Sequence, residues 1–168
     1  MSLFQFITSE SPIEEIQNPH IEHLSIRQAR DLGMELPNFI DENPDIDVDQ
    51  PIISICDSEE HLDDIEIKHD LGFGDEVAEY SRKEFSGRLF WRYSPKRVLE
   101  LEKYLRKMLE QSKEVEVWSI WLDESAPVRI KSTTASKLSA QDLKFLDISE
   151  GFTGPECLII KRTKKEKD

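Results

Sequence analysis

Hydrophobic residues follow a helical period most clearly in residues 95–112. The apolar positions of this segment recur every three or four residues and share one helix face: Val98, Leu101, Tyr104, Leu105, Met108 and Leu109. Ser94 precedes the segment and can cap its first turn, and Pro95 suits the first helical position. The pattern predicts an amphipathic helix over residues 95–112 that buries one face.

Apolar runs on both sides of this helix are typical of strands. They cover residues 87–93, 114–122, 128–132 and 156–162. The second run is apolar on both of its sides, which predicts a central strand covered on two faces. Its expected core residues are Val117, Trp118, Ile120 and Trp121.

A short second helix is indicated after the third of these strands. Ser139 and Asp142 have the spacing of a capping box, and Leu138 and Leu143 occupy the positions of a hydrophobic staple. These signals predict a helix at about 139–147.

The order of elements over residues 87–163 is then β-α-β-β-α-β, which is the ferredoxin-like arrangement. We therefore predict an α+β protein whose antiparallel or mixed sheet carries its helices on one face. This fold hosts many unrelated functions, so it does not indicate an activity.

The N-terminal half has weaker patterns. Strands are expected at 3–9, 51–56 and 64–70, and helices at 25–33 and 74–85. These elements fit either one extended domain or the first half of a duplicated ferredoxin-like pair, and the chain length favours the single domain. Within this single α+β domain, 1–168, residues 1–86 are expected to form an acidic N-terminal region, residues 87–163 a ferredoxin-like region and residues 164–168 a charged tail.

Charge is distributed unevenly along the chain. The net formal charge is −13, but residues 1–80 hold 21 acidic and three basic residues, a net of −18. Residues 81–168 hold 14 acidic and 19 basic residues, a net of +5, and all four histidines lie in the acidic half. Such asymmetry indicates either that the halves attract each other or that one half presents a negative face to a partner.

Three aspartates alternate in the stretch from Asp45 through Asp47 to Asp49. A calcium-binding EF-hand loop needs glycine at its sixth position and glutamate at its twelfth. Those positions hold Gln50 and Cys56 here, so calcium ligation is not predicted. The aspartates instead indicate a solvated edge or a stripe that binds a cationic partner.

Residues 56–70 combine acids with His61 and His69, which are residue types that ligate metals. Their spacing matches none of the common zinc motifs. A site made of His61, His69 and an aspartate is the alternative, but the sequence predicts no metal and no other cofactor.

Several function classes lack support in the sequence. Residues 81–97 interleave basic and aromatic residues, but the neighbouring acidic half would oppose nucleic acid. We expect free thiols at Cys56 and Cys157, a cytoplasmic location, and neither a secretory signal nor a membrane span. No motif for a catalytic nucleophile is present, and the oligomeric state stays open.

These observations favour a non-catalytic binding or regulatory protein that presents an acidic surface to a basic protein partner. The residues expected to form that surface are Asp45, Asp47, Asp49, Glu59, Glu60, Asp63 and Asp64. The alternative is a small, metal-dependent enzyme that uses carboxylates and histidines of residues 41–70.

Overall fold

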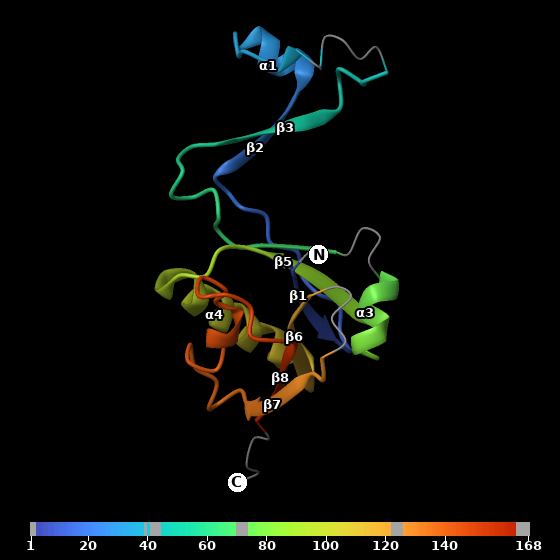
Figure 1. The fold of residues 1–168 in the computed structure, drawn as a ribbon, viewed down its shortest axis with the longest axis vertical. Coiled ribbons are helices and arrows are strands. Elements are labelled where there is room, and N and C mark those ends of the chain that lie inside the picture. Colours follow the sequence, from blue (N-terminus) through green and yellow to red (C-terminus); the bar gives the residue numbers. More distant parts are fainter. Residues whose placement is uncertain (1–2, 39, 41–44, 70–73, 122–125, 164–168) are drawn as a thin grey trace. The chain divides into compact units, whose positions relative to one another are not determined.

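The computed structural model describes residues 3–38, 40, 45–69, 74–121 and 126–163 (Figure 1). The chain forms two compact units: unit 1 comprises residues 1–17 and 64–168, and unit 2 comprises residues 18–63. Unit 2 is therefore inserted between two segments of unit 1. That the whole chain is one domain stays a prediction, and the expected charged tail at 164–168 lies outside the described residues.

Unit 1 is built on a six-stranded mixed sheet with the strand order β4-β5-β1-β6-β8-β7. Its strands are β1 (Leu3–Ser9), β4 (Glu66–His69), β5 (Phe85–Phe90), β6 (Glu114–Trp121), β7 (Arg129–Thr134) and β8 (Glu156–Lys161). Neighbouring strands are antiparallel, except that β7 and β8 are parallel. The predicted α+β class with a mixed sheet is thus confirmed.

The long helix α4 (Pro95–Gln111) forms where the helical period predicts it. Ser94 caps the helix, because its Oγ accepts a hydrogen bond from the backbone N–H of Arg97 at 3.2 Å, and Pro95 lies in the first turn. All six apolar residues of the predicted face are buried: Val98, Leu101, Tyr104, Leu105, Met108 and Leu109. The side-chain pattern and the cap together account for this element.

Both faces of the sheet are covered. On one face, Ile7, Val117 and the buried side of α4 belong to one hydrophobic cluster. On the other face, Phe6 and Trp118 form a second cluster with Val77 of the short helix α3 (Gly74–Tyr80). The central position predicted for β6 is confirmed, because it pairs with β1 on one side and β8 on the other and is buried on both faces. Of its four expected core residues, Val117, Trp118 and Ile120 are buried, whereas Trp121 at the end of the strand is only half-buried.

The second helix of the C-terminal half is replaced by turns and a three-residue 3₁₀ helix, η1 (Lys144–Leu146). Ser139 does not cap a helix: its hydroxyl and its backbone N–H both donate to the Asp142 carboxylate, at 2.8 and 2.9 Å. The segment still buries Leu143 and Leu146 in the same cluster as α4. The sequence predicts the helices on one face; α4 and this segment share a face, but α3 packs on the opposite one.

The ferredoxin-like topology of residues 87–163 is not confirmed. β1 lies between β5 and β6, and β8 lies between β6 and β7, so the sheet is larger and ordered differently. The side chains of β7 and β8 suit their positions in this order. Arg129, Ile130 and Lys131 of β7 are exposed, as is typical of an edge strand, whereas β8 is largely buried. Among the described residues, β1, β4 and β5 join the C-terminal strands in one sheet.

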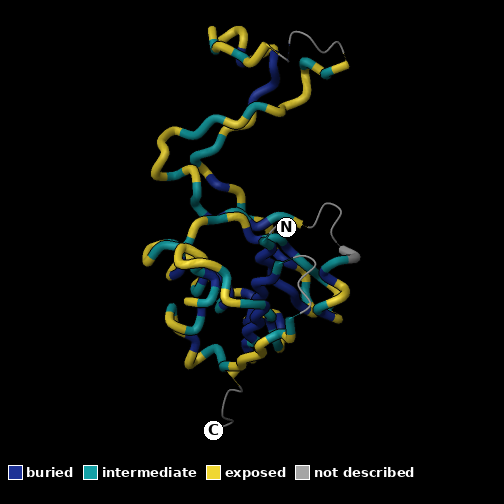
Figure 2. The backbone as a smooth tube through the Cα atoms, in the orientation of Figure 1, coloured by how far each residue is buried: buried dark blue, intermediate teal, exposed yellow. Residues whose placement is uncertain are grey.

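Unit 2 contains a two-stranded sheet and a short helix that lies between its two strands along the chain. β2 (Ile21–Ser25) pairs antiparallel with β3 (Pro51–Cys56), and α1 (Ile26–Asp31) begins directly after β2. Ser25 and Gln28 form the predicted capping box, and Gly33 ends the helix region with a positive φ of 72°. Few of the described residues of unit 2 are buried, namely Asn18, Leu24, Ser25, Ile26, Ala29 and Ile40, whereas buried positions are concentrated in unit 1 (Figure 2).

Candidate functional site

Most of the net negative charge lies on unit 2. Residues 18–63 hold 12 Asp and Glu against two Arg, a net formal charge of −10 out of −13 for the whole chain. The remaining residues, which form unit 1, are therefore nearly balanced at −3. The 46 residues of unit 2 therefore combine most of the net negative charge of the chain with a small buried core.

The three alternating aspartates lie in turns between α1 and β3, not on an extended strand. Asp47 shapes the turn, because its Oδ1 accepts from the backbone N–H of Asp49 at 2.9 Å. Asp49 forms a bidentate ion pair with Arg27, with N–O distances of 2.7 and 3.0 Å. The hydrogen bond from Arg27 lowers the pKa of Asp49, and the same contact raises the pKa of Arg27. All three aspartates are exposed, so their side chains are accessible.

A second acidic group lies in the turns that follow β3. Glu59 and Glu60 are exposed and Asp63 is half-buried. This group is separated from Asp45–Asp49 by β3, whose six residues span about 20 Å. Unit 2 therefore carries two acidic patches, one at each end of β3.

Asp64 is placed differently from the other six predicted partner-binding residues. It belongs to unit 1, and its Oδ1 accepts from Arg97 Nε at 2.7 Å. The side chains of Asp64 and Arg97 are only 14% and 13% exposed. This carboxylate is thus engaged in an ion pair that ties the start of β4 to the first turn of α4.

Two histidines and an aspartate converge at the open end of the β2–β3 pair. His20 immediately precedes β2 and Asp57 immediately follows β3, and the backbone N–H of Asp57 donates to the His20 carbonyl at 3.2 Å. The Nδ1 atoms of His20 and His61 lie 2.7 and 2.8 Å from the two carboxylate oxygens of Asp57. The imidazole rings stack with centroids 3.7 Å apart.

The side chains of this cluster are partly exposed, and the two histidines stabilise the ionised form of the aspartate. The side chains of His20, Asp57 and His61 are 34%, 55% and 29% exposed. Hydrogen bonds from His61 and then His20 lower the pKa of the Asp57 carboxyl, because they favour its ionised form. One ligand atom from each side chain, a nitrogen of each histidine and an oxygen of the aspartate, lies within 4.8 Å of the other two. Histidine nitrogens and carboxylate oxygens are common ligands of divalent transition metals such as zinc.

A buried asparagine holds the two histidine backbones in place. Asn18 is 3% exposed; its Nδ2 donates to the His61 carbonyl at 2.7 Å, and its Oδ1 accepts from the His20 backbone N–H at 3.0 Å. A turn bond from the His61 N–H to the Ser58 carbonyl at 3.2 Å brings the chain back towards β2. The cluster is therefore fixed by backbone contacts as well as by its own hydrogen bonds.

Sequence reasoning places the alternative metal site at His61 and His69. His69 instead lies on β4 of unit 1, where its Nε2 is 2.8 Å from the Ile13 carbonyl and its N–H donates to Glu15 at 2.7 Å. The sequence reasoning missed His20, because it is 37 residues from Asp57 along the chain. Only the pairing of β2 with β3 brings it close, and a strand at residues 21–25 was not among the expected elements.

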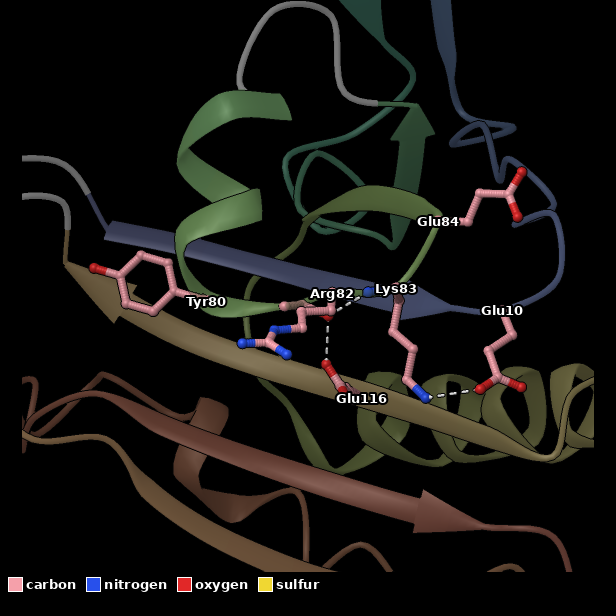
Figure 3. A pocket seen from close by; sticks show the side chains of 7 residues that line it. Glu10, Tyr80, Arg82, Lys83, Glu84 and Glu116 are labelled. Carbon is pink, nitrogen blue, oxygen red and sulfur yellow. Dashed lines mark hydrogen bonds and ion pairs between the residues drawn. The ribbon is translucent and has the colours of Figure 1, made fainter.

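Unit 1 has an open pocket of about 620 Å³, lined by Glu10, Tyr80, Ser81, Arg82, Lys83, Glu84 and Glu116 (Figure 3). Glu116 Oε2 accepts from Ser81 at 2.6 Å, from Thr8 at 2.8 Å and from Trp118 at 3.0 Å. The Glu116 carboxylate on β6 thus connects this strand to Thr8 of β1 and to Ser81, which follows α3. Its hydrogen-bond donors come from the protein itself, which is typical of a structural carboxylate.

Lys83 lies at the rim of the same pocket between two carboxylates. Its Nζ is 2.8 Å from Glu114 and 3.3 Å from Glu10, and Figure 3 shows the contact with Glu10. Burial acts to lower the pKa of Lys83, but the hydrogen bond and charge of Glu114, followed by those of Glu10, outweigh it and raise the pKa. These groups pair with one another inside unit 1.

The basic and aromatic stretch at 81–97 contributes largely to unit 1 packing. Phe85, Trp91 and Tyr93 pack against the main cluster, and Arg97 is the partner of Asp64. Both cysteines are free, as predicted; Cys157 is buried, which raises the pKa of its thiol, and Cys56 is partly exposed. Among the described helices, none combines the length and the apolar content needed to cross a membrane.

Comparison with known proteins gives no match: no family model matches the chain, and neither a curated protein nor a solved structure does.

Proposed function

We propose that the protein is a non-catalytic binding or regulatory protein whose unit 2 presents an acidic surface to a basic protein partner. The observation that carries this proposal is the net charge of −10 on 46 residues, including the exposed carboxylates of Asp45, Asp47, Asp49, Glu59 and Glu60. Acidic surfaces of this kind attract basic partners and accelerate their association.

Charge repulsion within unit 2 supports this interpretation. The sequence of unit 2 holds 12 acids and two basic residues, Arg27 and Arg30, and Arg27 is paired with Asp49. A net charge far from zero weakens a compact state by self-repulsion. Lysine and arginine side chains of a partner would offset that repulsion and would bind most readily where the carboxylates are exposed.

Exposed apolar side chains of unit 2 add to the proposed interface. Leu32, Ile52 and Leu62 are 67%, 48% and 56% exposed. Protein interfaces combine an apolar centre with a charged rim, so such residues suit contact with a protein better than contact with a small ion. The free thiols of Cys56 and Cys157 support a reducing compartment such as the cytoplasm for this role.

The test compares two variants that change net charge equally. The first replaces five exposed acids of unit 2 by their amides, at Asp45, Asp47, Asp49, Glu59 and Glu60. The control replaces five exposed acids of unit 1 by glutamine, at Glu79, Glu84, Glu100, Glu110 and Glu150. Asp64 is left unchanged in both, because its ion pair with Arg97 is largely buried, unlike the exposed pair of Asp49 with Arg27.

Partners are captured from nuclease-treated native lysate on the immobilised full chain, and the association rate of the captured protein is then measured. We expect the unit 2 variant to slow association at least about tenfold, and higher salt to slow association with the unaltered chain. The unit 1 variant should change it much less. Equal effects of the two variants, or an association rate that is independent of salt, would contradict the proposal.

A further inference from the structure

The positions of His20, Asp57 and His61 follow from the strand pairing of unit 2. Ile21 faces Cys56 in the antiparallel register, so His20 and Asp57 occupy the next pair beyond the strands. His61 returns to the same place through a turn, and Asn18 fixes its backbone relative to that of His20. The local fold therefore brings three donor side chains together from segments that enter and leave unit 2.

We propose that His20, Asp57 and His61 bind one divalent first-row transition metal ion, with Zn²⁺ as the probe, through one imidazole nitrogen from each histidine and one oxygen of the carboxylate. Zinc sites with three such protein ligands leave a fourth position for water or another ligand. The imidazole donors favour zinc-type ions over Ca²⁺ and Mg²⁺, which prefer oxygen ligands.

The distances are close to those that such a site requires. Zinc–ligand bonds of about 2.0–2.1 Å in a tetrahedral site place neighbouring donor atoms about 3.3 Å apart. The Nδ1 atom of His20 is 2.7 Å from one Asp57 oxygen and that of His61 is 2.8 Å from the other, and one ligand atom from each side chain lies within 4.8 Å of the other two. An ion bound through one of these oxygens requires the histidine in contact with that oxygen to move away by about half an ångström and the other histidine to turn towards the ion. Partly exposed side chains at the end of a strand pair can make that adjustment by small rotations.

Each histidine can supply a lone pair without a change in its charge. In a neutral imidazole one nitrogen carries the hydrogen and the other accepts, so the tautomer with hydrogen on Nε2 frees Nδ1 for the metal. Binding through Nδ1 then replaces the contacts of the two histidines with Asp57 by bonds to the ion.

A metal ion at this place would strengthen the region of the chain with the smallest core. An isolated two-stranded sheet is marginally stable, and small folds commonly rely on a metal or a disulfide. Unit 2 has six buried residues among those described, and the segments near its two ends meet at the proposed site. The ion would join the residues before β2 to those after β3 and would offset two of the ten net negative charges.

The first experiment is calorimetric titration of the metal-free, full-length chain with Zn²⁺ in a non-chelating buffer. One ion per chain is expected, with a dissociation constant in the micromolar range or tighter. His20→Ala, His61→Ala and Asp57→Asn should each weaken binding by about 100-fold or more, since even outer-shell partners of a metal contribute about 10- to 100-fold. Circular dichroism confirms that each variant is folded; Asp57→Asn keeps the side-chain shape if an alanine variant unfolds.

His23→Ala and His69→Ala are matched controls. His23 is exposed on β2 beside Ser54, with Nδ1 2.9 Å from the Ser54 hydroxyl, and His69 lies in unit 1. Both should retain the zinc affinity of the unaltered chain, and so should Cys56→Ser. Absence of a stoichiometric site, or a loss of binding in these controls that equals the loss in His20→Ala and His61→Ala, would overturn the proposal.

The second experiment measures amide hydrogen exchange with and without Zn²⁺. At a free concentration of about 100 times the dissociation constant, exchange through opening of unit 2 should slow by up to about 100-fold. Exchange in the β6–β8 region of unit 1 should change little, and Asp57→Asn should abolish the protection. Stoichiometric binding without protection of residues 18–63 would contradict the stabilising role of the ion.

Discussion

Truncating Leu105 to alanine tests whether α4 is a core element of unit 1. Leu105 is 0% exposed and packs in the main hydrophobic cluster between α4 and the sheet. The substitution removes three carbon atoms, which at about 0.8 kcal/mol for each buried CH₂ corresponds to about 2.4 kcal/mol. The cavity left behind adds to this value, so the expected loss of unfolding free energy is about 2–5 kcal/mol.

Leu99 provides a matched control on the same helix. Its side chain is 51% exposed, so Leu99→Ala applies the same chemical change at the solvent side of α4. Since alanine also has the higher helix propensity, the expected change is within about 0.5 kcal/mol. The difference in unfolding free energy between the two variants therefore measures the contribution of burying the Leu105 side chain.

Urea unfolding followed by tryptophan fluorescence measures both values. The chain has three tryptophans, and Trp91, Trp118 and Trp121 all belong to unit 1, so the signal follows the unit that contains α4. The midpoint should fall in Leu105→Ala without a change in the slope m. A loss below about 1 kcal/mol, or equal losses in the two variants, would refute the assignment of Leu105 to the core.

Three further predictions concern local contacts. Ser25→Ala removes the capping-box oxygen of α1 and should cost about 1 kcal/mol, seen as faster amide exchange at 26–31; unchanged exchange would speak against the cap. Gly87→Ala places a methyl group 3.0 Å from Ile13 Cγ2 and should destabilise unit 1 by about 1–3 kcal/mol in urea unfolding; a neutral effect would indicate that the side chain moves aside. The pKa of Asp147 is lowered to about 2 by hydrogen bonds, the largest from Lys144, so its stabilising contribution is present above about pH 4 and is lost as the pH falls towards 2. Asp147→Asn should remove this component of the acid sensitivity, and parallel stability–pH curves for the two proteins between about pH 2 and 4 would contradict it.

Elements whose signals are local in the sequence were predictable. The face of α4, its cap at Ser94 and the capping box at Ser25 depend on side chains within one or two turns, and the structure confirms all three. The segment after β7 shows the limit of such signals. Its buried Leu143 and Leu146 suit a single 3₁₀ turn equally well, and the Ser139 hydroxyl donates to a carboxylate instead of accepting from the backbone.

Strand order and the histidine cluster depend on pairing between distant segments. β1 enters the sheet between β5 and β6, and nothing within residues 87–163 indicates this insertion. His20 meets Asp57 only because β2 and β3 pair in one particular register, and a shift of one residue would turn the side chains to opposite faces. Spacing along the chain therefore favoured His69 as a ligand, whereas its Nε2 lies 2.8 Å from the Ile13 carbonyl in unit 1.

The distribution of ion pairs gives the physical reason to look for partners at unit 2. Several of the described basic residues of unit 1 form ion pairs within that unit: Lys131 with the buried Glu156 at 2.5 Å, Arg97 with Asp64, and Lys83 with Glu114. Unit 2 has two arginines for 12 acids, and one bound divalent ion would supply only two positive charges. Metal binding therefore cannot replace a basic partner in balancing unit 2. The two hypotheses can also fail separately, because the variant that neutralises five exposed acids retains His20, Asp57 and His61.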